Sequence, residues 1–173
     1  MGKREEVKFE KKPRDKYYTI DPVAVNTLVP HLRKPTNFIE PCAGDGELVR
    51  GLTRLGVDCC GAYDIEPQAS WIEQKDCLTL GRQDADYYIT NPPFTWSVLQ
   101  PLMSHMINIL PTWLLLPADF MHNVRMGPYM KQCRKVVSVG RMYWEENKVK
   151  GVENFCWYLF DKDYKGPTEF VGR

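Results

Sequence analysis

Short apolar segments alternate with helix-patterned segments along most of the chain. Runs typical of buried strands lie at residues 37–41, 57–63, 86–90, 112–116, 134–139 and 155–160. Helical spacing marks residues 47–55, which Gly56 closes, and residues 96–110. This alternation predicts an α/β, Rossmann-like fold: a mainly parallel, twisted sheet with helices on both faces.

An earlier helix is predicted from Asp21 to about Leu32. Asp21 is a typical N-cap residue, and Pro22 suits the first helical position. Pro30 has no backbone N–H, so we expect it to bend the helix. The apolar side chains that share one face of this helix are Val25, Leu28, Val29 and Leu32.

The length and composition fit one globular domain. The chain has 173 residues, of which 43% are hydrophobic and 12% aromatic, enough to bury a core. Residues 1–16 hold seven basic and four acidic side chains and are predicted to form a flexible charged leader. We therefore expect a single domain over residues 17–173.

The cysteines and histidines do not form a metal-binding pattern. The six cysteines include no CxxC pair, and the three histidines lie far from them in sequence. No apolar segment resembles a signal peptide or is long enough to cross a bilayer. We expect no metal, reduced thiols, a cytoplasmic location and no membrane partner.

The net charge of +1 gives no overall indication of nucleic-acid binding, but the charges are unevenly distributed. Residues 40–90 carry a net charge of −6, and residues 121–150 carry +5. An acidic middle with basic flanks can present a basic face to phosphates. Ordinary solvated surface explains the same counts equally well.

Two glycines follow the predicted strand at residues 37–41. Gly44 and Gly46 let a ligand approach the backbone at the carboxyl edge of a parallel sheet. Asp64 ends the next strand, 20 residues after Gly44, where an acid can accept both hydroxyls of a ribose. The turn lacks the full GxGxxG pattern of dinucleotide sites. These residues predict a nucleoside-containing cofactor.

The sequence Asn91-Pro92-Pro93-Phe94 follows the strand at residues 86–90. Two prolines remove two backbone donors, restrict the turn and leave its backbone carbonyls as acceptors. The Asn91 side chain adds a second carbonyl acceptor, and Phe94 adds a flat apolar ring. Together they suit a planar group that bears an NH2: two acceptors for its hydrogens and a ring for stacking.

The order and spacing of these segments resemble class I S-adenosylmethionine-dependent methyltransferases, especially N6-adenine DNA methyltransferases. The resemblance covers about residues 17–160. It implies S-adenosylmethionine as cofactor and Asn91, Pro92, Pro93 and Phe94 as catalytic residues. The cofactor-binding residues that it implies are Tyr18, Thr19, Glu40, Cys42, Ala43, Gly44, Gly46, Asp64, Ile65, Asp76, Cys77 and Asn91. In this family, residues like 17–19 contact the methionine part, and an acid like Asp76 holds the adenine amino group.

Two departures affect the choice of substrate. Phe94 replaces the commoner tyrosine, and related enzymes that act on guanine N2 in RNA also have Asn-Pro-Pro-Phe. The chain leaves little room for a separate target-recognition domain, so residues 121–129 and 144–151 are the candidate reading loops. Trp144, Lys148 and Lys150 lie in the second loop.

The favoured function is methylation of adenine N6 in DNA, on a base that is flipped out or single-stranded. The alternatives are RNA methylation at adenine N6 or guanine N2, methylation of a protein glutamine, and a non-catalytic protein that binds the cofactor. We expect a nucleic-acid partner and a monomer or homodimer.

Overall fold

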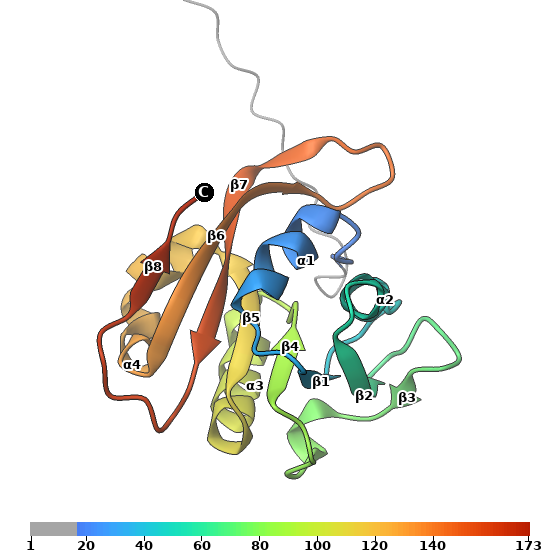
Figure 1. Cartoon of the computed structure of the whole chain (residues 1–173), viewed down its shortest axis with the longest axis horizontal. Coiled ribbons are helices and arrows are strands. Elements are labelled where there is room, and N and C mark those ends of the chain that lie inside the picture. The colour runs from blue at the N-terminus through green and yellow to red at the C-terminus, as the bar shows by residue number, and fades with distance from the viewer. Residues whose placement is uncertain (1–16) are drawn as a thin grey trace, which may run out of the picture.

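The computed structural model describes residues 17–173, and the predicted leader at residues 1–16 lies outside the described residues. The described chain forms one eight-stranded sheet in the order β3-β2-β1-β4-β5-β7-β6-β8 (Figure 1). Neighbouring strands from β3 to β5 are parallel, and only β7 is antiparallel to its neighbours, β5 and β6. The predicted mainly parallel α/β fold is confirmed. The strands are β1 (Asn37–Glu40), β2 (Asp58–Asp64), β3 (Glu73–Gln74), β4 (Tyr87–Thr90), β5 (Thr112–Pro117), β6 (Cys133–Tyr143), β7 (Lys150–Phe160) and β8 (Glu169–Val171).

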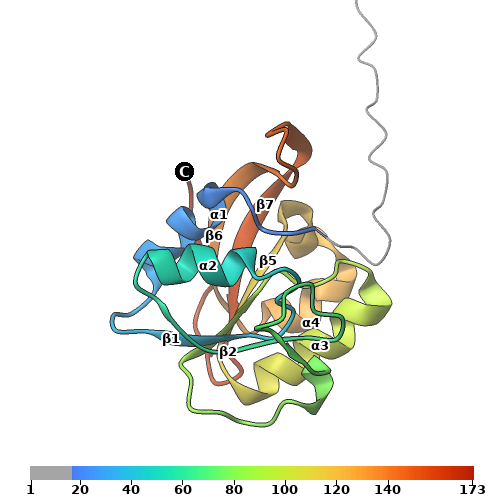
Figure 2. The same ribbon diagram turned by 90° about the vertical axis from the view of Figure 1, so that its right-hand side faces the viewer.

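Helices cover both faces of the sheet (Figure 2). On one face, α1 (Pro22–Leu28) and α2 (Glu47–Arg54) enclose a core that includes Leu28, Leu52 and Trp157. On the other, α3 (Trp96–Ile109) and α4 (Gly127–Met130) enclose a second core with Met103 and Tyr158. Among the described residues, no helix is both long and apolar enough to span a bilayer. Residues 17–173 also contain four 3-10 turns: η2 (Val29–His31), η3 (Cys77–Thr79), η4 (Ala118–His122) and η5 (Val124–Met126).

Helix α1 begins as the sequence predicts. The Asp21 side chain accepts a hydrogen bond of 3.0 Å from the Val23 N–H, and Pro22 is the first helical residue. The α-helix ends at Leu28, and Pro30 lies in the 3-10 turn η2, so the expected bend takes the form of a change in helix type. The second Asp21 oxygen accepts a hydrogen bond of 3.2 Å from the Tyr143 N–H, which ties α1 to the end of β6.

Strands β6 and β7 form a longer ribbon than the hydrophobic pattern predicts. Each has 11 residues, whereas the apolar runs suggest only residues 134–139 and 155–160. The first residues of β7, from 150 to 154, lie beyond the core and are mostly exposed, so they carry no apolar pattern. The sequence also gives no indication of β3 and β8, which are short and mostly exposed.

The parallel strands β1, β2 and β4 bring three predicted segments to one edge of the sheet. These strands end at Glu40, Asp64 and Thr90, and β1 pairs in parallel with both β2 and β4. The carboxyl ends of parallel strands share one edge. The glycine turn, the acid after β2 and the Asn-Pro-Pro-Phe turn therefore lie next to one another.

Candidate active site

The glycine turn after β1 packs tightly against its surroundings. Gly44 and Gly46 both have positive φ angles, of 55° and 85°, which favour glycine. A Cβ on Gly44 would lie 2.8 Å from a ring carbon of Tyr18, so a larger residue does not fit there. The Gly44 N–H donates to an oxygen of Asp64 at 2.7 Å, and this bond joins the turn to the end of β2.

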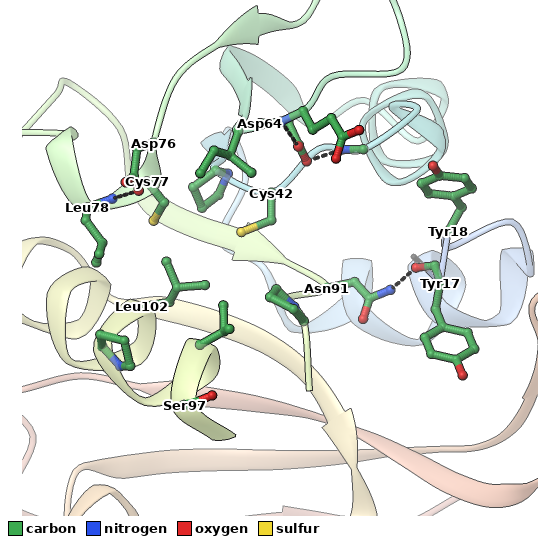
Figure 3. A pocket seen from close by; sticks show the side chains of 17 residues that line it. Tyr17, Tyr18, Cys42, Asp64, Asp76, Cys77, Leu78, Asn91, Ser97 and Leu102 are labelled. Carbon is green, nitrogen blue, oxygen red and sulfur yellow. Dashed lines mark hydrogen bonds between the residues drawn. The ribbon is translucent and has the colours of Figure 1, made fainter. Parts of the chain in front are cut away.

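A cavity of about 380 Å³ opens beside this turn, and we call it the cofactor cavity (Figure 3). Its walls come from the turns after β1, β2 and β4, from η3, and from the first two turns of α3. The predicted residues that line it are Tyr18, Cys42, Gly44, Asp64, Ile65, Asp76, Cys77, Asn91 and Pro93.

Six predicted residues do not line the cofactor cavity, and one of them, Phe94, lines a second cavity that is described below. Thr19, Glu40 and Ala43 surround a small chamber of about 20 Å³, which Tyr18, Cys42 and Asn91 also line. Such a volume suits one water molecule. Gly46 lies beneath the Trp71 ring at the start of α2, and Pro92 is buried. Thr19, Glu40, Ala43 and Gly46 therefore shape the turns behind the cavity.

Tyr17, from the predicted segment at residues 17–19, also lines the cavity. Helix α3 contributes a largely apolar wall that was not predicted, made of Ser97, Val98, Pro101 and Leu102. Helix α3 begins directly after the Asn-Pro-Pro-Phe turn, so its first turns must lie at the same sheet edge. That position was a signal for these residues. Pro41, Glu66 and Leu78 also line the cavity, and each is next in the chain to a predicted cofactor-binding residue.

The Asp64 carboxylate is held by the backbone on both sides. One oxygen accepts from the Gly44 N–H, and the other accepts from the Glu66 N–H at 2.7 Å. A carboxylate has about four acceptor positions, so capacity remains for a ligand's hydroxyls. Asp76 is restrained in the same way, because its carboxylate accepts from the Leu78 N–H at 2.9 Å (Figure 3).

Glu40 differs from these two acids because it is almost completely buried, with 1% of its surface exposed. Burial raises the pKa of Glu40 from 4.5 to about 8. One carboxyl oxygen accepts a hydrogen bond of 3.1 Å from the Cys42 N–H. At neutral pH Glu40 is therefore mostly uncharged.

The Cys42 thiol is neutral as well. A hydrogen bond to Cys77 and burial raise the pKa of Cys42 well above its usual range. A thiol that keeps its proton is a poor nucleophile. Cys42 therefore serves as part of an apolar lining. No group of three or more metal-ligating side chains occurs in the part of the chain that the structure describes.

Asn91 begins the predicted catalytic turn and contacts the chain just before α1. Its Nδ2 donates a hydrogen bond of 2.7 Å to the main-chain carbonyl of Tyr17 (Figure 3). Its Oδ1 is buried and has no hydrogen-bond partner among residues 17–173. Buried polar atoms usually have partners, so an unpaired acceptor of this kind is a candidate contact for a ligand.

Phe94 faces a second cavity, of about 320 Å³, which we call the aromatic cavity. Half of its ten lining residues are aromatic: Tyr17, Phe94, Phe120, Trp144 and Phe155. The ring of Phe94 lies nearly parallel to that of Tyr17, with centroids 6.2 Å apart, and 5.8 Å from that of Phe155. A cavity of this size and lining suits a planar aromatic ligand.

The second candidate reading loop reaches the aromatic cavity. Trp144 and Gly151, the first and last residues of that loop, both line it, and Trp144 is buried in its wall. The first loop, at residues 121–129, contributes no lining residue, but it follows Phe120 directly. Tyr17 is the one residue that lines both cavities.

Comparison with known proteins gives no sequence match and clear structural matches. No family model and no curated protein match the chain. A Listeria monocytogenes protein assigned as a class I S-adenosylmethionine-dependent methyltransferase has 11% identity and a TM-score of 0.56 over 87% of this chain and 61% of its own. A modification subunit assigned to a type I restriction enzyme of Vibrio vulnificus has 12% identity and a TM-score of 0.58. The match covers 90% of this chain and 46% of the Vibrio chain.

A third structure, assigned as an RNA methyltransferase of Pyrococcus horikoshii, has 13% identity and a TM-score of 0.53, with 82% of this chain and 81% of its own covered. The present chain thus spans less than two thirds of the Listeria and Vibrio proteins. At these identities the likeness concerns the fold. The chain has the Rossmann-like fold of class I methyltransferases.

Proposed function

We propose that this protein is an S-adenosylmethionine-dependent methyltransferase that acts on an exocyclic amine, with adenine N6 in DNA as the favoured target. One observation carries the proposal: the Asn-Pro-Pro-Phe turn lies between a cavity suited to a nucleoside cofactor and a cavity lined by aromatic rings. Methyl transfer requires these two ligands to meet at one point.

The residues of the cofactor cavity fit S-adenosylmethionine. Asp64 has acceptor capacity for the ribose hydroxyls, and the neighbouring Ile65 is an exposed apolar side chain suited to cover the adenine. Asp76, which lines the same cavity, would accept from the adenine amino group. The Gly44 backbone and Tyr18 border the part expected to hold the methionine end. When bound, this cofactor supplies an electrophilic methyl carbon.

The turn supplies what an aryl amine needs to react. The lone pair of such a nitrogen is delocalised into its ring. Asn91 Oδ1 and the Pro92 carbonyl accept the two hydrogens and favour a tetrahedral nitrogen with a localised lone pair. Asn91 and Pro92 would thus hold the nitrogen for attack on the methyl carbon that bound S-adenosylmethionine would supply, and the extra proton would leave to water. The chain needs no strong base, because the alkylated ammonium is acidic.

The aromatic cavity favours a nucleobase over a glutamine side chain. A base offers a π-face to Phe94 and its neighbours, and each stacked base gains about 1–3 kcal/mol. A glutamine amide has no ring to use this surface. A base within a duplex cannot reach the cavity, so the target is flipped out or single-stranded. The Vibrio modification subunit and the Pyrococcus RNA methyltransferase support a nucleic-acid substrate.

Transfer of a labelled methyl group tests the proposal directly. The parent protein is incubated with labelled cofactor and, in parallel, with DNA, RNA and protein, and the modified base is identified by mass spectrometry. We expect N6-methyladenine in DNA. Methylation of RNA alone or of protein alone would exclude DNA as the substrate. Cofactor binding without methyl transfer to DNA, RNA or protein would support the non-catalytic alternative.

Asn91→Ala serves as the matched variant in this assay. The lost acceptor matters most in the transition state, so turnover should fall by roughly a hundred- to a thousandfold, which corresponds to about 3–4 kcal/mol. Cofactor affinity, measured by calorimetry, should change much less. Equal turnover in parent and variant would exclude the amine-binding role of Asn91.

A further inference from the structure

An asparagine side chain can point either of two ends at a ligand. Its oxygen accepts hydrogen bonds and its nitrogen donates them. A substrate amine offers hydrogens, so only the oxygen end of Asn91 is useful in the proposed reaction. With the amide reversed, N–H groups would face N–H groups. Something must therefore set the orientation of Asn91.

The structure contains such a group 74 residues earlier in the chain. The Tyr17 carbonyl accepts a hydrogen bond of 2.7 Å from Asn91 Nδ2. A carbonyl can accept but cannot donate, so it selects the nitrogen end of the amide. The oxygen end is then left over, and Oδ1 is indeed buried with no hydrogen-bond partner in the described part of the chain.

The Tyr17 side chain and the residues that follow it are themselves held in place, and they position the Tyr17 carbonyl. The Tyr17 ring packs against Phe94, and its edge contacts Trp144 with centroids 5.8 Å apart. On the other side, the Ile20 N–H donates to the Tyr18 carbonyl at 2.9 Å. The next residue, Asp21, caps α1 and is anchored to Tyr143. The segment that carries the acceptor is therefore fixed to both the catalytic turn and the sheet.

We propose that the main-chain carbonyl of Tyr17 is a positioning group, which holds Asn91 Nδ2 and so presents Oδ1 to the acceptor amine. This inference rests on the proposed methyltransferase function and adds a residue to its machinery. Tyr17 acts through Asn91 and does not itself bind the reacting atoms. Its role explains why an asparagine suits this position.

Aspartate at position 91 separates the two ends of the amide. Asn91→Asp keeps an acceptor for the amine but loses the donor for Tyr17. An ionised carboxylate places an oxygen against the Tyr17 carbonyl, and both burial and that carbonyl disfavour the charged form. A protonated carboxyl restores the bond, because its O–H donates to Tyr17 while its carbonyl accepts from the amine.

The pH profile of Asn91→Asp therefore tests the proposal. Turnover is measured for parent and variant on the same substrate, and their ratio removes effects common to both. We expect the ratio of variant to parent to rise about tenfold as the pH falls from about 8.5 to about 6. A ratio that stays constant over this range would overturn the positioning role.

A second measurement is independent of turnover. In protein labelled with ¹⁵N-asparagine, the Asn91 amide should show one proton that is shifted downfield and exchanges slowly, because it is bonded to Tyr17. This signal should persist in Tyr17→Phe, which keeps the ring packing, and weaken in Tyr17→Ala. Fast exchange of both protons in the folded parent protein would contradict the inference. Failure of the parent to methylate any substrate would instead count against the proposed function, since the amide signal does not depend on it.

Discussion

The burial of Glu40 has a consequence for stability that the exposed acids do not share. The folded protein keeps this carboxyl protonated up to a pKa of about 8, while an unfolded chain releases the proton near pH 4.5. Between these values the folded state binds more protons than the unfolded state. The free energy of unfolding should therefore fall as the pH rises through this window.

Glu40→Gln should remove this pH dependence. A glutamine has the same shape and cannot ionise, so the variant should gain stability relative to the parent between about pH 5 and pH 8, on the order of a few kcal/mol at the upper end. Urea unfolding at several pH values measures the difference. Glu146→Gln, at an exposed position, is the control and should show no such trend. If the difference in the free energy of unfolding between Glu40→Gln and the parent did not change with pH, the Glu40 carboxyl would be ionised throughout this range.

Phe94 allows a test of stacking that leaves the cofactor cavity intact, because Phe94 lines only the aromatic cavity. Phe94→Ala should weaken substrate binding by about 1–3 kcal/mol, mainly as a higher KM. Phe94→Tyr and Phe94→Trp keep a flat ring and should remain active. Steady-state kinetics alongside cofactor calorimetry checks this expectation. A loss of cofactor affinity equal to the loss of substrate affinity would show that Phe94 acts on the fold rather than on the acceptor.

At the scale of elements, α1 links the start of the described chain to the catalytic turn. The Asp21 side chain is almost fully buried and serves two backbone N–H groups, those of Val23 in α1 and Tyr143 in β6. Few side chains connect elements so far apart in sequence. This carboxylate therefore helps to fix the segment around Tyr17.

Asp21→Ala should therefore destabilise the protein by about 2–4 kcal/mol, through loss of the cap and an unpaired buried N–H. Asp21→Asn keeps the cap but turns an NH2 toward the Tyr143 N–H, so its effect should be smaller. Chemical unfolding of both variants measures the costs. If both variants lost the same small amount of stability, water would be replacing the carboxylate at the Val23 and Tyr143 N–H groups.

The hydrophobic pattern predicts the elements that carry most of the core, because a buried strand or a helix face repeats its apolar side chains. Residues 112–116 and 155–160 are clear examples. It does not predict β3, β8 or the outer half of β7, where most residues are exposed and show no apolar pattern. In the site, glycines and acids at strand ends indicate Gly44 and Asp64. The Tyr17–Asn91 hydrogen bond uses a main-chain carbonyl. Every residue has this group, so the sequence does not indicate which one Asn91 contacts.

At the scale of the whole molecule, one end of the predicted basic flank reaches the proposed acceptor site. Residues 121–150 carry a net charge of +5, to which the second candidate reading loop contributes Lys148 and Lys150. Gly151, which borders Lys150, lines the aromatic cavity. We therefore expect Lys148 and Lys150 to contact phosphates next to a bound base.

Neutralising Lys148 and Lys150 to glutamine should weaken nucleic-acid binding and make its salt dependence shallower. Each lost phosphate contact should reduce the slope of log K against log salt by about 1. Fluorescence anisotropy over a salt titration gives the slope. Lys162 and Lys165, in the segment after β7 at the opposite edge of the sheet, provide the control pair. Affinity that is insensitive to salt in the parent would point to an acceptor without phosphates.

The two cavities have only Tyr17 in common, and this affects the order of events in a catalytic cycle. Spent cofactor can leave through its own cavity without passing the acceptor, and fresh cofactor can enter the same way. For the proposed methyltransferase this separation predicts that a nucleic acid stays bound between successive turnovers. On a long substrate with many target bases, we therefore expect doubly modified molecules to appear before the unmodified ones are used up.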